Sequence, residues 1–190
     1  MKQKLTLRRV LASAVAALAA AAAVWLLCRW VGYDLQLRIG NEPVYEIAND
    51  DYTQIIDVPE DGLWQAVPLE AGQTLYGCRL RFSTHGELYR AGMVMVDLCD
   101  ADGTILREAA GNYANIFDDN FTGFAFGTAY TAAQAETLCL HIYNVVEWEG
   151  PLGLWASTGT VGALSLTADG IDADATLALQ YMTCLLYTSD

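Results

Sequence analysis

The chain divides into two parts that differ in the pattern of their hydrophobic positions. Residues 10–28 form an apolar run without a charge, whereas from about residue 50 the apolar residues come in short runs separated by turn residues. A helix of about 20 apolar residues is long enough to cross a bilayer. Short runs in which apolar and polar residues alternate are typical of strands. The pattern therefore predicts one N-terminal transmembrane helix followed by an all-β domain.

Alternation is clearest where Cys78, Leu80 and Phe82 occupy every second position of one run. One set of side chains in such a run faces the core, and the other set faces the opposite side of the sheet. The one helical candidate in the second part is a turn near 131–136. Strands are expected at 52–57, 63–69, 74–83, 90–99, 104–108, 121–126, 136–145, 161–167 and 175–182, and weak alternation within 33–50 is compatible with one more.

A hairpin is predicted at residues 100–103, where Asp-Ala-Asp-Gly separates two apolar runs. An Asp-Gly pair favours a tight turn because glycine adopts a positive φ at little cost. Short strands at regular spacing, with no strong amphipathic helix among them, are typical of a β-sandwich.

The basic N-terminus predicts the orientation of the apolar run. Lys2, Lys4, Arg8 and Arg9 precede the run, and basic flanks stay in the cytoplasm. A cleaved signal peptide is the alternative, but its apolar region usually has only about 7–15 residues. We therefore expect an uncleaved signal anchor in the cell membrane, single-pass as given, with the later domain outside the cytoplasm.

These boundaries give five expected regions. They are a cytoplasmic basic tail at 1–9, a transmembrane signal anchor at 10–31, a linker at 32–50, a β-sandwich at 51–182 and a non-native tail at 183–190.

The net charge of the second part limits the classes of molecule that it can bind. Residues 32–190 contain five arginines, no lysine and all 23 acidic residues, which gives a net charge of −18. Such a surface repels phosphate backbones, so nucleic acid is not an expected partner. An anionic lipid surface would repel it as well, so cations and neutral ligands such as sugars remain as partners of this part, and the membrane is a partner only through the integral N-terminal segment.

Cysteines leave two alternatives. Cys28 lies in the apolar run and Cys184 in the tail, so three cysteines remain in the expected domain. Disulfides form outside the cytoplasm, and cysteine also serves as a small core residue. Either Cys78 and Cys139 form a disulfide and Cys99 is a thiol, or all three are free thiols.

No residue pattern indicates a catalytic or metal site. There is no nucleophile elbow. Glycoside hydrolysis needs two carboxylates across a cleft, and in Glu147-Trp148-Glu149 neighbours on one strand point to opposite faces, so they do not form a facing pair. Asp100 and Asp102 supply the oxygens that calcium prefers, but they lack the distant glutamate of an EF-hand, and a turn explains them. We expect no enzyme activity and no cofactor, with calcium as the alternative.

A sugar-binding site is the most specific chemistry that the sequence suggests. Aromatic rings stack on the apolar faces of sugars, and polar side chains hold the hydroxyls. The predicted ligand-binding residues are Trp148 and Tyr113, with Arg90, Asn112 and Glu147 as polar partners. The alternative is that the aromatic residues close the end of the core.

Three segments carry a family resemblance: 69–75 (LEAGQTL), 79–82 (RLRF) and the alternating run of 94–103 that ends in Asp-Ala-Asp-Gly. Together they resemble jelly-roll domains from extracytoplasmic loops of bacterial polytopic, glycosyltransferase-like membrane proteins, which are similar to carbohydrate-binding modules. The resemblance covers about residues 50–182 and implies a jelly-roll β-sandwich.

The last residues, 184–190, resemble translated sequencing-adapter DNA. We therefore expect the native chain to continue. Three functions follow: a non-catalytic, membrane-anchored domain that binds glycan or a partner in the cell envelope, the truncated N-terminal part of a polytopic glycosyltransferase-like protein, or an adhesion or scaffold protein without a ligand of its own.

Overall fold

A computed structural model describes residues 14–26, 44–88, 91–145 and 151–183. The expectations for Arg90, Glu147, Trp148, Cys28 and Cys184 lie outside these ranges, as do most of the linker and the tail. The chain divides into two units, 1–40 and 41–190.

The first unit contains a helix over 14–26, within the apolar run of the sequence. None of the helices in the described ranges combines the length and apolar character needed to cross a bilayer.

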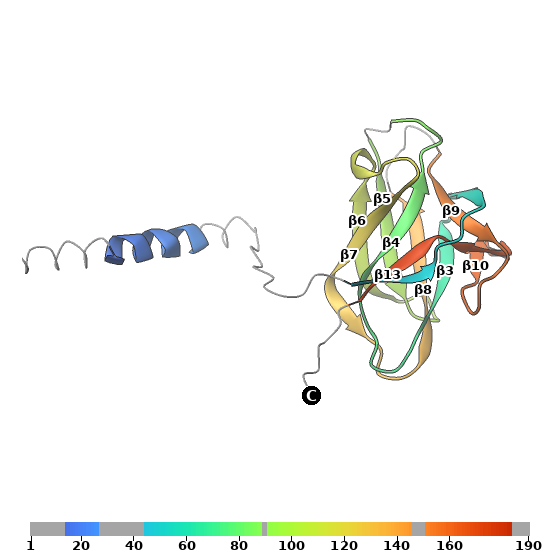
Figure 1. Ribbon diagram of the computed structural model, residues 1–190. Coiled ribbons are helices and arrows are strands. Elements are labelled where there is room, and N and C mark those ends of the chain that lie inside the picture. Colours follow the sequence, from blue (N-terminus) through green and yellow to red (C-terminus); the bar gives the residue numbers. More distant parts are fainter. Residues whose placement is uncertain (1–13, 27–43, 89–90, 146–150, 184–190) are drawn as a thin grey trace, which may run out of the picture. The chain divides into compact units, whose positions relative to one another are not determined.

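The second unit is an all-β fold of two antiparallel sheets, which confirms the β-sandwich expectation (Figure 1). Sheet A has seven strands: β1 (Val44–Asn49), β2 (Gln54–Asp57), β4 (Thr74–Ser83), β7 (Asn120–Thr131), β9 (Gly153–Thr158), β12 (Ala175–Leu177) and β13 (Leu179–Thr183). Sheet B has six: β3 (Leu63–Leu69), β5 (Met93–Cys99), β6 (Ile105–Asn112), β8 (Glu136–Asn144), β10 (Leu166–Ala168) and β11 (Ile171–Asp172). A short 3₁₀ helix, η1 (Tyr113–Asn115), connects β6 to β7.

The core lies between the sheets and follows the alternation of the sequence. Cys78, Leu80 and Phe82 of β4 are fully buried in one hydrophobic cluster with Leu140 and Ile142 of β8. Burying each of the large side chains contributes about 1.5–3 kcal/mol. The residues between them in sequence lie on the outer faces of the two sheets.

Strand order in sheet A brings together segments that are distant in sequence. β4 pairs with β7 on one side and with β13 and then β9 on the other. The two partners share that side because β12 and β13 form one extended stretch, in which β12 pairs with β9, β13 pairs with β4, and the change occurs at Ala178. Ala178 donates its N–H to the Trp155 carbonyl of β9, and its own carbonyl accepts the N–H of Arg81.

Three local predictions need correction. The strand expected at 161–167 is wrong over its first half, because Val161 and Leu164 form an isolated bridge around a turn and β10 begins only at Leu166. β9 was not expected, because its sequence GLWAST begins at a glycine and ends in small polar residues, which weakens the strand pattern. Residues 132–135 bend between β7 and β8 and are not helical, since β7 extends to Thr131 and pairs there with β4.

The hairpin at 100–103 is confirmed. Asp100 donates its N–H to the Thr104 carbonyl, and the Gly103 N–H returns to the Asp100 carbonyl. The Asp100 carboxylate accepts the N–H groups of Asp102 and Thr104, so it stabilises the turn itself.

Candidate functional site: an arginine–aromatic face on sheet A

Two arginines of β4 project from the outer face of sheet A. Arg79 and Arg81 alternate with the buried Cys78, Leu80 and Phe82, so the strand that supplies the core also presents two cations outward. They are two of only five arginines after residue 32, in a region with a net charge of −18. We call this surface the arginine–aromatic face: Arg79 and Arg81 with the rings of Tyr45, Tyr52 and Phe121 around them.

Each guanidinium lies over aromatic rings. The Arg79 guanidinium carbon is 4.6 Å from the centre of the Tyr45 ring and 5.6 Å from that of Phe121. The Arg81 carbon is 3.7 Å from the Tyr52 ring centre and 5.8 Å from that of Phe121. Such cation–π contacts hold long side chains against the sheet. The face is therefore ordered before any ligand arrives.

The tyrosine rings remain accessible to solvent. Tyr45 is 43% exposed and Tyr52 is 40% exposed, and the neighbouring Ile47 and Ile55 are also exposed. Trp155 of β9 extends the surface, with its ring centre 5.7 Å from that of Tyr52 in an edge-to-face arrangement. Accessible rings beside fixed donors can bind a ligand that has both apolar and polar faces.

Arg81 has an acidic partner. Its Nη2 lies 2.7 Å from Asp119 Oδ1, and its Nε donates to the same oxygen at 2.9 Å. Burial opposes the charge of Arg81, but the hydrogen bond and the charge of Asp119 outweigh it and raise the pKa of the guanidinium. Arg81 is therefore a fixed cation.

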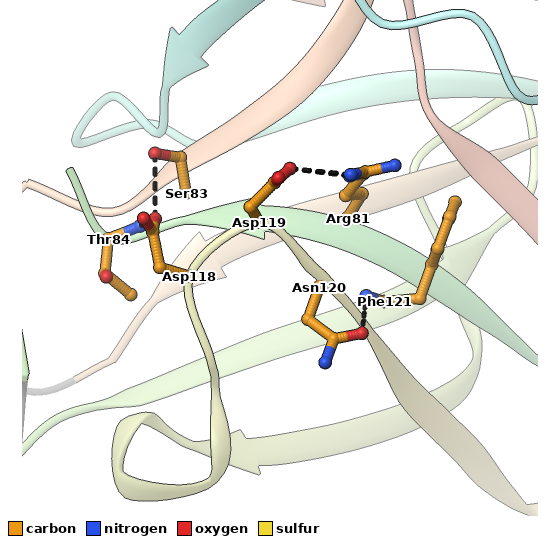
Figure 2. A network of polar contacts seen from close by, with 7 residues as sticks. All are labelled: Arg81, Ser83, Thr84, Asp118, Asp119, Asn120 and Phe121. Atoms are coloured by element: carbon orange, nitrogen blue, oxygen red, sulfur yellow. Dashed lines mark hydrogen bonds and ion pairs between the residues drawn. The ribbon is translucent and has the colours of Figure 1, made fainter. Parts of the chain in front are cut away.

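Figure 2 shows how the loop before β7 holds Asp119 in place. Its neighbour Asp118 accepts the Thr84 N–H at 2.7 Å and the Ser83 hydroxyl at 3.3 Å. The hydrogen bond from the Thr84 N–H lowers the pKa of Asp118 and outweighs the opposing effect of burial. Asp118 thus fastens the β6–β7 loop to the end of β4, and Asp119 follows with a φ of 54°.

Arg79 has neutral partners instead. Its Nη1 donates to Gln180 Oε1 at 3.3 Å, and its Nη2 donates to the Phe121 carbonyl at 3.5 Å. Within the described ranges no carboxylate lies within ion-pair distance of Arg79. It therefore keeps a positive charge that a ligand oxygen can share.

Two of the predicted binding residues have local structural roles. Tyr113 is 1% exposed in η1, packs against Gly92 and donates its hydroxyl to Asn144 Oδ1, so it closes the end of the core. The Asn112 side chain accepts the Ala114 N–H at 2.9 Å and caps η1. The expectation that Tyr113 presents a ring to a ligand is wrong because the β6–β7 loop folds it inward.

Of the two cysteine alternatives, the structure has the free thiols and not the Cys78–Cys139 disulfide. Cys78 points from sheet A into the core, whereas Cys139 alternates with the buried Leu138 and Leu140 and lies on the outer face of sheet B. Sheet B therefore separates the two sulfurs. Cys78, Cys99 and Cys139 are free thiols in this structure.

Sequence reasoning missed the arginine–aromatic face, although part of the signal was present. The alternation of Arg79 and Arg81 with core residues places both on one outer face. The aromatic partners come from β1, the segment before β2, and β7, and only the strand order of sheet A brings them to β4.

Comparison with known proteins identifies no family. No family model matches the chain, and no curated protein matches it. Solved structures of the infectious bursal disease virus protein VP2 share some similarity: the subviral particle (18% identity, TM-score 0.34, 77% of this chain and 39% of that chain), the Gt strain (14%, 0.29, 77% and 42%) and the Gx strain (17%, 0.31, 76% and 40%). This chain thus spans about two fifths of the length of the viral chains.

Proposed function

We propose that this chain is a non-catalytic, glycan-binding module of jelly-roll type, held outside the cytoplasm by its N-terminal membrane anchor. The observation that carries the binding function is the pair of exposed tyrosine rings, Tyr45 and Tyr52, held beside the guanidinium groups of Arg79 and Arg81. The anchor rests on the apolar run of 10–28 and its basic flank.

A neutral glycan suits this surface better than an anionic one. Sugar rings have apolar faces that stack on tyrosine and hydroxyls that accept hydrogen bonds from guanidinium groups. The net charge of −18 after residue 32 repels polyanions over several ångströms at ordinary salt. The ligand is therefore an uncharged polysaccharide that lies across the strands of sheet A.

The acids beside the face support binding over hydrolysis. Asp119 forms an ion pair with Arg81, and Asp118 accepts a hydrogen bond from the backbone N–H of Thr84. A glycosidase needs one carboxylic acid that donates a proton and a second carboxylate across the substrate. A lowered pKa makes Asp118 a poor proton donor, so the polar network positions the face without doing chemistry.

The test is a titration of the full chain in detergent with neutral and acidic cell-envelope polysaccharides, followed by Trp fluorescence and affinity electrophoresis. Tyr45→Ala and Tyr52→Ala should each weaken binding of a neutral glycan by about 1–3 kcal/mol, by analogy with the stacking of bases on aromatic side chains.

The matched control is Ile171→Ala, which removes an exposed apolar side chain from β11 of sheet B and should leave the affinity unchanged. Unchanged fluorescence and unretarded migration with every polysaccharide would contradict the glycan-binding function. Equal losses in all three variants would contradict the choice of face.

A further inference from the structure

Cys99 and Cys139 lie directly opposite each other on neighbouring strands of sheet B. Cys99 of β5 pairs with Cys139 of β8 in the antiparallel register. Each is the neighbour in sequence of core residues, Leu98 on β5 and Leu138 on β8, so both thiols project from the outer face of the sheet. They share one face and one register position.

The register also fixes the separation of the two backbones. The Val145 N–H donates to the Met93 carbonyl at 3.0 Å, which makes 93 and 145 a hydrogen-bonded pair. Such pairs recur at every second position of the ladder, so 99 and 139 form another. Opposed Cα atoms in these pairs are about 5.5 Å apart, within the range of about 4.4–6.8 Å that a disulfide spans. The Cβ atoms, about 5.5 Å apart in such a pair, must approach to about 4.5 Å, so the bridge needs a small local shift of the two strands.

The two thiols differ in access to solvent. Cys99 is 1% exposed, whereas Cys139 is half-buried. Burial, then the charges of Asp97 and Cys139, raises the pKa of Cys99 to about 11, and burial also raises the pKa of Cys139. Both groups are therefore thiols at neutral pH, and Cys139 is the one that an external reagent reaches first.

We propose that Cys99 and Cys139 form a cross-strand disulfide when the protein meets a disulfide oxidant. The Cys139 thiolate attacks one sulfur of the oxidant, the S–S bond of the oxidant breaks, and one thiolate leaves. The Cys99 thiolate then attacks Cys139 Sγ, breaks this mixed disulfide and releases the second thiolate. Two protein thiols are oxidised, one disulfide is reduced to two thiols, and the protons of Cys99 and Cys139 pass to the leaving thiolates.

This link is independent of glycan binding. It lies on the outer face of sheet B, whereas the arginine–aromatic face is on sheet A. It joins two neighbouring strands of one sheet and closes a loop that includes β6, η1 and β7.

In the experiment, the full chain in detergent is treated with oxidised glutathione and the reaction is quenched with acid. The remaining thiols are then alkylated in denaturant, and the peptides are mapped by mass spectrometry without reduction. Cleavage after Arg107 separates Cys99 from Cys139, and a second cleavage at acidic residues separates Cys139 from Cys184. The expected product is a Cys99–Cys139 cross-linked pair that disappears on reduction, with Cys78 alkylated.

Two variants keep the result interpretable. Cys78→Ala should leave the cross-link intact, whereas Cys139→Ser should abolish it and leave Cys99 alkylated after denaturation. The rate of formation in the unchanged protein should rise with pH, because a larger fraction of each thiol is then ionised. Alkylation of both Cys99 and Cys139 after prolonged oxidation, or a link from either to Cys78 or Cys184, would overturn the proposal.

Discussion

The pKa of the Asp97 carboxyl is set by burial and by the polar residues around it. It is 1% exposed on β5, its Oδ2 accepts the Tyr143 hydroxyl at 3.0 Å, and its Oδ1 has no hydrogen-bond partner among the described residues. His141, directly opposite on β8, stacks on Tyr143 with ring centres 4.5 Å apart. Burial and the charge of Glu108 raise the pKa of Asp97, against the opposing effects of Tyr143 and His141.

A raised pKa means that the folded state binds the Asp97 proton more tightly than the unfolded state does. Stability contributed by this group is therefore fully present below the unfolded pKa and is lost as pH rises through the folded pKa. Asp97→Asn should remove that loss, so urea unfolding between pH 4 and pH 8 should show a smaller fall in stability for the variant.

Asp102→Asn is the control, because Asp102 is an exposed residue of the hairpin turn. It should leave in place the fall in stability that Asp97 causes. An Asp97→Asn variant whose stability falls with pH as steeply as that of the unchanged protein would show that Asp97 is not the group responsible.

Gly→Ala substitutions at two glycines with the same φ separate the cost of backbone strain from the cost of steric crowding by the new Cβ. Gly62 and Gly72 both have a φ of 81°, where an L side chain is strained. A Cβ at Gly62 would lie 2.6 Å from His141 Nε2 and 2.7 Å from the Ile142 carbonyl oxygen, whereas one at Gly72 would meet nothing within 4 Å. Gly72→Ala should cost about 1 kcal/mol, and Gly62→Ala about 3 kcal/mol because it adds overpacking. Equal losses in chemical denaturation would contradict the crowding at Gly62.

At the scale of elements, Gln65 joins the two sheets. It is fully buried on β3 of sheet B, and its Oε1 accepts the Leu177 N–H of β12 in sheet A at 2.9 Å. Ala178 donates to the Trp155 carbonyl of β9, so the preceding N–H of Leu177 points away from that strand and needs another acceptor.

Gln65→Leu should destabilise the fold by about 2 kcal/mol, because it keeps the volume but leaves a buried N–H without a partner. Gln54→Leu is the matched change, since the Gln54 amide donates to the Ser157 carbonyl in a half-buried position, and it should cost less than about 0.5 kcal/mol. The comparison is made by thermal and urea unfolding. A Gln65→Leu variant as stable as Gln54→Leu would show that the Leu177 N–H finds water or another acceptor.

The elements that the sequence predicts best are apolar runs with clear turn signals at both ends. β3 at 63–69 and β4 at 74–83 match their predicted bounds because glycine- and acid-containing turns end them, and in β4 the alternation of Cys78, Leu80 and Phe82 adds to that signal. β7 runs to Thr131, well past the predicted end at residue 126, because pairing with β4 continues where its own alternation fades.

The candidate site could not be predicted for a related reason. Arg79 was visible as an outward residue of a strand, but Tyr45 reaches it only because β1 pairs with β13 and β13 pairs with β4. That order depends on long-range pairing, which no local pattern encodes. Tyr113 was misplaced because burial of a loop aromatic depends on a glycine, Gly92, in another loop.

At the scale of the whole molecule, the sequence combines a basic, apolar N-terminus with a strongly acidic sandwich. The apolar run of 10–28 contains the helix described at 14–26 and has no charge, whereas all 23 acids follow residue 33. Because the run is about as long as a bilayer core requires, we expect the full chain to remain in the membrane pellet after a carbonate wash and to dissolve only in detergent.

The decisive comparison places charges at the centre of the run. Leu18→Lys combined with Ala22→Lys should release the protein, because each lysine costs about 2.5–3.5 kcal/mol at the middle of a membrane helix. Ala22→Leu is the control, since it keeps the run apolar and should leave the protein in the pellet. Protease added outside intact cells should degrade the sandwich only if it faces outward, which separates insertion from orientation. Release of the unchanged chain by carbonate would contradict the prediction of a membrane anchor. The titration with polysaccharides would still test glycan binding by the sandwich independently.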